Sequence, residues 1–261
     1  MMRLSEVRLP ARAAVHRRRM WESTVYEIQV REDGREGEAP LKVELPSVTT
    51  VLKSWPSPEL ERWKLKQVAA AWRDNADKGG YSDLGRLINL AVDRTALRRG
   101  VACHRALEDH FSGRSVEPAY ESVLSRILVA VGREAQAKLS EVPVVGDGYA
   151  GTADLLGRTK DGFPCVLDLK TGKGVWESNW AQVYAYASSA WLVTGGRLRR
   201  MPEGMRAGVV HAPLNGPVDS PELVGEVEVV WLGDRLDSAS RMWELSLLVH
   251  QLRKELDVHA V

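Results

Sequence analysis

The pattern of apolar and polar residues changes near residue 140 of this 261-residue chain. Before that point, apolar residues recur every three or four positions over roughly 58–76, 83–112 and 119–139, which is typical of amphipathic helices. After it, apolar segments at 141–145, 149–158 and 163–170 are separated by Asp-Gly pairs. This second pattern predicts three successive strands joined by tight turns.

The remaining segments complete an α/β order. Alternating residues at 23–30 and 41–47 predict an N-terminal hairpin, and 206–214 and 222–232 predict two later strands. Residues 178–195 predict a helix, because Ser178 is a suitable cap and Gly195 a suitable stop; residues 234–256 predict a closing helix. We therefore expect an α/β fold with a mixed central sheet flanked by helices, in the order α-β-β-β-α-β, and an N-terminal helical lobe.

The same pattern predicts three parts along the chain. Residues 1–20 are rich in arginine without a long apolar run, so they predict a disordered basic arm; an over-extended start, with Met20 as initiator, explains them equally well. Residues 21–99 predict the hairpin and the helical lobe. Residues 100–261 predict the core, with the C-terminal strand and helix.

Composition narrows the range of partners. Because 36 Lys and Arg residues face 35 Asp and Glu residues, a nucleic-acid ligand would need a local basic patch. The two cysteines, Cys103 and Cys165, are too few for a four-cysteine metal site, and their scarcity favours a reducing compartment such as the cytoplasm. No apolar run approaches the roughly 18 residues of a membrane span, so we expect no membrane partner.

Charged residues interrupt two of the strands expected after residue 140. Asp168 and Lys170 share one strand face, and Asp154 lies on the neighbouring strand. Buried charge is costly unless it is paired or binds a metal, and two nearby carboxylates suit Mg²⁺ or Mn²⁺. The ordinary alternative is an Asp–Lys pair on a solvated strand face.

Four motifs occur in a fixed order: G-x-x-x-H in "GVACHRALE" (100–108), G-x-x-D in "GTAD" (151–154), D-x-K in "DLK" (168–170) and Q-x-x-x-Y in "QVYAY" (182–186). In this order they resemble the PD-(D/E)XK nuclease superfamily, in its RecB-like exonuclease branch. "PSVTTVLKSW" (46–55) is similar to a segment common in phage-encoded members. The resemblance covers about residues 40–212 and implies a restriction-endonuclease-like core.

The resemblance assigns the central chemistry to residues at matching positions. It implies that Lys170 is the catalytic lysine and that Asp154 and Asp168 are catalytic metal ligands. It further implies that His104 and the backbone carbonyl of Leu169 bind the same metal.

The resemblance also suggests residues around this centre. Gln182 and Tyr186 lie four positions apart on one helix face and match a pair that contacts DNA. Apart from the resemblance, Arg94 and Arg98 share one helical face and could bind phosphates together with Lys173, with a solvated face as the ordinary alternative. Glu108, one turn beyond His104, and Glu141 are candidate supporting carboxylates.

The implied function is a magnesium- or manganese-dependent deoxyribonuclease, an exonuclease that hydrolyses phosphodiester bonds of linear single- or double-stranded DNA. Its setting would be phage or bacterial DNA recombination or repair, with a phage single-strand-annealing or recombination protein as partner. The iron–sulfur cysteine cluster of some relatives is missing, so we expect no such cluster. The sequence leaves two alternatives open: a catalytically silent DNA-binding protein of the same fold, or a metal hydrolase of a non-nucleic substrate.

Overall fold

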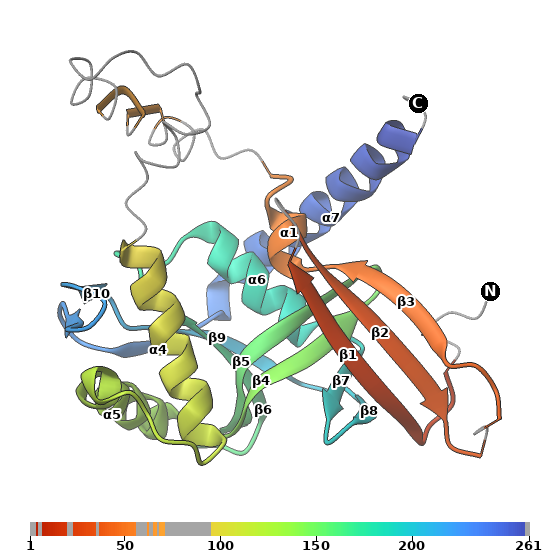
Figure 1. Ribbon diagram of the computed structural model, residues 1–261, viewed down its shortest axis with the longest axis horizontal. Coiled ribbons are helices and arrows are strands. Elements are labelled where there is room, and N and C mark those ends of the chain that lie inside the picture. The colour runs from red at the N-terminus through yellow and green to blue at the C-terminus, as the bar shows by residue number, and fades with distance from the viewer. Residues whose placement is uncertain are drawn as a thin grey trace.

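A large mixed sheet forms the centre of the protein. The computed structural model describes residues 7–19, 23–34, 37–55 and 95–258, together with residue 4 and a few positions between 62 and 70. Ten strands of these residues form one sheet (Figure 1). In their spatial order they are β12 (Glu228–Trp231), β9 (Arg206–His211), β6 (Pro164–Lys170), β5 (Tyr149–Thr159), β4 (Ala135–Gly146), β7 (Trp191–Thr194), β8 (Arg197–Arg200), β1 (Ala11–Arg19), β2 (Thr24–Glu32) and β3 (Leu41–Pro46). A separate short pair joins β10 (Leu214–Asn215) and β11 (Glu222–Leu223).

The middle of the sheet contains the three strands expected after residue 140. β4, β5 and β6 are antiparallel neighbours, and β9 then lies parallel to β6. The connection from β6 to β9 passes through helix α6 (Glu177–Ala187), because parallel neighbours need a crossover. The hairpin β7–β8 is inserted between α6 and β9.

Helices cover both faces of the sheet (Figure 1). On one face, α6 packs with α1 (Val48–Leu52) and α7 (Leu236–Val258), which follows the short 3-10 helix η3 (Gly233–Arg235). On the other face lie α4 (Thr95–Phe111) and α5 (Pro118–Glu134). Their buried residues, among them Leu107 and Ile127, recur at helical spacing, so each helix buries one stripe. The expected α/β architecture, a mixed sheet flanked by helices, is confirmed.

The N-terminal segment corrects one expectation. Residues 11–19, which we expected within a disordered arm over 1–20, form β1 and pair with β2 along their whole length. Ala11 and Ala13 are buried, while Arg12 and Arg18 point to the exposed face. The arginines made this segment resemble a solvated basic arm, although Arg12 and Arg18 lie at the outward positions of an alternating pattern. The hairpin β2–β3 thereby joins the central sheet.

Three element boundaries also differ from the expected ones. The helix expected over 178–195 ends at Ala187, because the bulky apolar residues that follow pair with β4 and β8 as strand β7. The helix expected over 119–139 ends at Glu134, where β4 begins. The strand expected over 222–232 is divided into β11 and β12, with Gly225 (φ 94°) between them.

Part of the expected helical lobe lies outside the described residues, including positions 83–94 and most of 56–76. Among the helices that the structure describes, none combines the length and apolar character that a membrane span requires. Cys103 and Cys165 are buried free thiols, and burial raises their pKa values to about 12 and about 11.

Candidate metal centre

The candidate site lies where two central strands separate. β5 and β6 are paired from Arg158–Pro164 to Leu155–Leu167, and the pairing ends there. Beyond that point, the backbone N–H of Leu169 donates instead to Asp154 Oδ2, at 2.6 Å. A side chain therefore takes the place of a strand partner and fixes the buried Asp154 carboxylate against β6.

The same backbone geometry directs the carbonyl of Leu169 into the opening. The carbonyl of the next residue, Lys170, accepts from Ala212 N at 2.9 Å and therefore points toward β9. Carbonyls of consecutive strand residues point in opposite directions, and the N–H and C=O of one residue point the same way. The Leu169 carbonyl thus faces the side on which Asp154 lies, and its role as a metal ligand stays a prediction.

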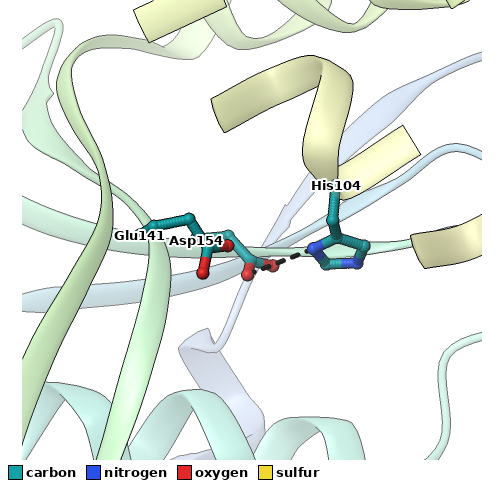
Figure 2. Close-up of side chains that lie close together, drawn as sticks. All are labelled: His104, Glu141 and Asp154. Carbon is teal, nitrogen blue, oxygen red and sulfur yellow. Dashed lines mark ion pairs between the residues drawn. The ribbon is translucent and has the colours of Figure 1, made fainter. Parts of the chain in front are cut away.

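One half of the site gathers three metal-binding side chains. The ligand atoms of His104, Glu141 and Asp154 all lie within 4.8 Å of one another (Figure 2). His104, from α4, places Nδ1 3.2 Å from Asp154 Oδ1. Glu141 comes from β4, on the other side of β5 from β6. We call these three residues the α4-side cluster.

Glu141 has an unusual backbone. The register pairs Ser140 with Leu155 and Val142 with Ala153, so Glu141 lies opposite Asp154. Its φ is 50°, and in the described part of the chain no other residue except glycine has a positive φ. Such a conformation costs free energy and is often retained where function requires it. Together with its place in the cluster, this conformation makes Glu141, expected from sequence as a supporting residue, a candidate metal ligand.

The electrostatics of the α4-side cluster favour a cation. Burial lowers the pKa of His104, but the charge of Asp154 and its hydrogen bond outweigh this and raise that pKa to about 9. Burial, with the nearby charge of Asp154, raises the pKa of Glu141 to about 7. Burial also opposes ionisation of Asp154, yet His104 holds its pKa below the ordinary value. Without a metal, the proton of His104 partly balances the two carboxylates.

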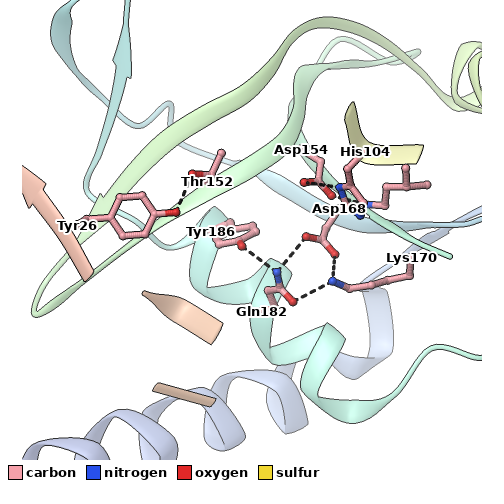
Figure 3. A network of polar contacts seen from close by, with 9 residues as sticks. Tyr26, His104, Thr152, Asp154, Asp168, Lys170, Gln182 and Tyr186 are labelled. Carbon is pink, nitrogen blue, oxygen red and sulfur yellow. Dashed lines mark hydrogen bonds and ion pairs between the residues drawn. The ribbon is translucent and has the colours of Figure 1, made fainter. Parts of the chain in front are cut away.

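The other half of the site joins the aspartate and lysine of the D-x-K motif. Asp168 Oδ2 lies 2.6 Å from Lys170 Nζ (Figure 3). Gln182 of α6 binds both partners: its Oε1 accepts from Lys170 Nζ at 3.0 Å, and its Nε2 donates to Asp168 Oδ1 at 3.1 Å. The same Nε2 lies 2.8 Å from the hydroxyl of Tyr186 and donates to it. We call these four residues the α6-side network.

Burial dominates the electrostatics of this network. It raises the pKa of Asp168 to about 6, although the charge of Lys170 opposes the shift. It also raises the pKa of Tyr186 well above its ordinary value, and the charge of Asp168 adds to this. Asp168 Oδ2 is buried and, despite its ion pair, accepts no hydrogen bond of good geometry among the described residues. This oxygen is the one that another cation could bind.

Two motif glycines allow the helices to approach. A Cβ on Gly100 would lie 2.9 Å from Thr171 Oγ1, so a side chain there would force either Thr171 or α4 to shift. A Cβ on Gly151 would lie 2.5 Å from the ring of Tyr186. Glycine at these positions brings α4 close enough for His104 to reach Asp154 and leaves room for Tyr186.

The other expected residues are placed as follows. Gln182 and Tyr186, expected to contact DNA, are buried, with exposed fractions of 8% and 4%, so their contacts favour support of Lys170 and Asp168 instead. Glu108, expected to support His104, binds Arg114 Nη2 at 2.9 Å and is not part of the α4-side cluster. The remaining phosphate-binding candidates are Lys173 and Arg98, both exposed, and Arg94, outside the described residues.

The donor set fits a hard divalent cation. The α4-side cluster offers one imidazole and two carboxylates, and Asp168 and the Leu169 carbonyl offer further oxygens nearby. Oxygen-rich sets of this kind suit Mg²⁺ or Mn²⁺ better than the tetrahedral nitrogen and sulfur sites of structural zinc. The structure does not place Asp168 in the three-residue cluster, so its role as a direct ligand stays a prediction.

Sequence reasoning missed the contact between Tyr26 and the central strands. The Tyr26 hydroxyl lies 2.7 Å from Thr152 Oγ1, two residues before Asp154 (Figure 3). No local pattern signals this contact, because the two residues are 126 positions apart.

A comparison with protein-family models finds no match to this chain, and a comparison with curated proteins finds none either.

Proposed function

We propose that this protein is a Mg²⁺- or Mn²⁺-dependent deoxyribonuclease of the PD-(D/E)XK superfamily, in its RecB-like branch. One observation carries the proposal. A group of metal-binding side chains, His104, Glu141 and Asp154, adjoins the ion pair of the buried Asp168 with the partly buried Lys170, and the Leu169 N–H links the two halves. A solvated Asp–Lys pair, the ordinary alternative, would not be buried in this way: the exposed fraction of Asp168 is 1%.

The order of elements supports the restriction-endonuclease-like part of the proposal. The chain runs α5, β4, β5, β6, α6 and β9, with the β7–β8 hairpin inserted before β9. This is the α-β-β-β-α-β order with one insertion. Asp154, Asp168 and Lys170 come from the parts of β5 and β6 where the two strands separate, and His104 of α4 and Glu141 of β4 lie next to Asp154.

The residues around the separated strands would have different roles in metal binding and catalysis. His104, Glu141 and Asp154 would hold the metal, with Asp168 and the Leu169 carbonyl beside them. When bound, the metal supplies positive charge that stabilises a phosphoryl group and makes nearby water more acidic.

Lys170 is the residue best placed to act on the attacking water. Its ammonium is held by Asp168 and Gln182, so it keeps one position instead of sampling many rotamers. A fixed ammonium can orient water and stabilise charge that develops on the phosphate, since it needs no reorganisation during the reaction. Gln182 would therefore be a positioning residue.

Lys173 and Trp176, which follow β6 in the chain, favour DNA over a non-nucleic substrate. Lys173 is exposed on the loop that directly follows β6. A contact of 3.0 Å between the carbonyl of Gly172 and His211 Nε2 connects this loop to the end of β9. Trp176, at the start of α6, has an exposed fraction of 67%. A lysine for phosphates and an open indole for bases form the usual surface for an unpaired strand. We propose that linear DNA ends are the substrate, in phage or bacterial recombination or repair.

Cleavage of defined DNA tests this function. The protein is incubated with end-labelled linear single-stranded and double-stranded DNA and with a closed circle, in Mg²⁺, in Mn²⁺ and in EDTA. The Lys170→Ala variant, purified in the same way, excludes a contaminating nuclease. We expect linear DNA to be degraded by the wild type only with metal, and not by the variant.

Two results would contradict the proposal. Cleavage that persists undiminished in EDTA would show that the reaction does not use this metal centre. A folded protein that binds Mn²⁺ and DNA but cuts neither form would be the silent DNA-binding alternative.

A further inference from the structure

Arg17 extends a row of side chains from the core to the site. On β1, Ala11 and Ala13 are buried on the face that packs against the core. Arg17 belongs to the same alternating set, and it lies directly opposite Tyr26 of β2. The Arg17 side chain is exposed, because this end of β1 extends beyond the buried core.

The partner of Arg17 is anchored to the strand that carries the proposed metal ligand. Tyr26 is buried, and its hydroxyl binds Thr152 Oγ1 at 2.7 Å. Thr152 lies two residues before Asp154 on β5 (Figure 3). Arg17, Tyr26, Thr152 and Asp154 therefore follow one another from the N-terminal strands to the α4-side cluster.

Arg17 is also electrostatically connected to this cluster. Its positive charge is among the groups that lower the pKa of Glu141, opposing the larger effect of burial. Among the described residues the side chain of Arg17 makes no hydrogen bond or ion pair. The neighbouring Arg18, on the opposite face of β1, instead pairs with Glu44 at 2.6 Å.

We propose that Arg17 is a phosphate-binding residue of the site, one that binds the backbone of the strand being cut. The inference rests on the proposed nuclease function and adds a second substrate-binding element to the site. β1 would hold the substrate on one side, and the Lys170–Lys173 loop would hold it on the other. Guanidinium suits this role, because it binds phosphate oxygens with two parallel donors.

The test compares Arg17→Gln with Arg18→Gln, which removes the same charge from the opposite face of the same strand. Binding of labelled single- and double-stranded DNA is measured without added metal over a range of salt concentrations. Cleavage kinetics are then measured with Mn²⁺. We expect Arg17→Gln to weaken binding and raise KM by about 5- to 20-fold. We also expect it to reduce the salt dependence by about one phosphate contact. Arg17→Lys should restore part of the loss, and Arg18→Gln should change binding by less than about twofold.

Two additional measurements define what Arg17 binds. Oligonucleotides with and without terminal phosphates distinguish the sources of the phosphate: an equal loss on both means a backbone phosphate, and a loss only on phosphorylated ends means a terminal one. Calorimetric Mn²⁺ titration detects a purely balancing role toward Glu141, which would change metal affinity, leave DNA binding unaltered and overturn the inference.

The outcomes for the inference and for the proposed function are distinct. If the wild type cuts DNA but Arg17→Gln and Arg18→Gln behave alike, the inference is wrong and the function stands. If the wild type binds DNA through Arg17 but cuts nothing, the inference stands and the nuclease function is wrong. A wild type that neither binds nor cuts DNA overturns both.

Discussion

Asp154 and Asp168 are both buried aspartates on neighbouring strands, yet their surroundings differ. Asp154 faces a histidine, a second carboxylate and a backbone N–H, and its pKa lies below the ordinary value despite burial. Asp168 faces a lysine and a glutamine, and burial raises its pKa to about 6. One carboxylate is kept charged among metal-binding groups, and the other is only partly compensated by Lys170.

This difference suggests that the two halves of the site have different roles. The α4-side cluster has the donor set of a metal site, while the α6-side network fixes a lysine beside it. A bound divalent cation would add positive charge near both carboxylates and favour their ionised forms. The comparison thus predicts that substitutions in the two halves will damage different steps.

The largest expected effect is on turnover in the α6-side network. Lys170→Ala should slow DNA cleavage at saturating Mn²⁺ by about 10³-fold or more, because it removes the fixed ammonium beside the reacting phosphate. Single-turnover cleavage measures this step without product release. Lys173→Ala is the matched control, since loss of this exposed lysine should raise KM and leave kcat nearly unchanged. Loss of kcat in both variants would mean that Lys170 has no special position.

A smaller effect is expected one contact away. Gln182→Ala removes the amide that binds both Lys170 and Asp168, so kcat should fall by about 10- to 100-fold. Tyr186→Phe removes only the hydroxyl that accepts from Gln182, and it should lower kcat by less than about threefold. Thermal melting of both variants is the control. If Gln182→Ala cuts DNA at the wild-type rate, the network supports the fold and not the lysine.

The α4-side cluster should respond to pH. A metal bound there would have to displace the proton of His104, whose pKa is about 9, and that of Glu141, whose pKa is about 7. Below these values protons compete with the cation, so Mn²⁺ affinity should rise with pH from about 6.5 to 9 and level off above. The slope should not exceed about tenfold per pH unit for each proton released. Calorimetry in buffers of different ionisation enthalpy counts these protons, and an affinity independent of pH would remove His104 and Glu141 from the metal site.

The smallest expected effect concerns how closely α4 approaches. Gly132, exposed on α5, has no atom within 4 Å of an added Cβ, so Gly132→Ala should stabilise the protein by about 0.5–1 kcal/mol. Gly100→Ala should lose that gain, because its Cβ would lie 2.9 Å from Thr171 Oγ1. Denaturant unfolding measures both variants. Equal stabilisation would show that Gly100 does not set the position of His104.

Local patterns predicted much of the fold. Strands β4 to β6, the hairpin β2–β3 and helix α7 follow from alternation, turn residues and helical spacing. β1 did not, because its many arginines resemble a solvated arm. β7 did not either, because its apolar residues continue the helical pattern of α6 and only pairing with β4 and β8 settles their conformation.

The candidate site shows the same limit. Motif spacing brought forward His104, Asp154, Asp168 and Lys170, which the structure places around one opening in the sheet. The central position of Glu141 depends on its register opposite Asp154 and on its positive φ, and neither is visible in the local sequence. The buried state of Gln182 depends on how α6 packs, so sequence reasoning favoured contact with DNA.

Calorimetric Mn²⁺ titration of matched variants tests most directly whether the α4-side cluster binds the metal and Lys170 serves only turnover. Asp154→Asn and Glu141→Gln remove charge from the α4-side cluster while keeping side-chain size, and they should weaken Mn²⁺ binding by about 10- to 100-fold. Lys170→Ala removes a positive charge near the cation and should leave binding unchanged or tighter, although it abolishes cleavage. Equal loss of Mn²⁺ in Lys170→Ala and Asp154→Asn, or unaltered binding in Asp154→Asn, would contradict the account.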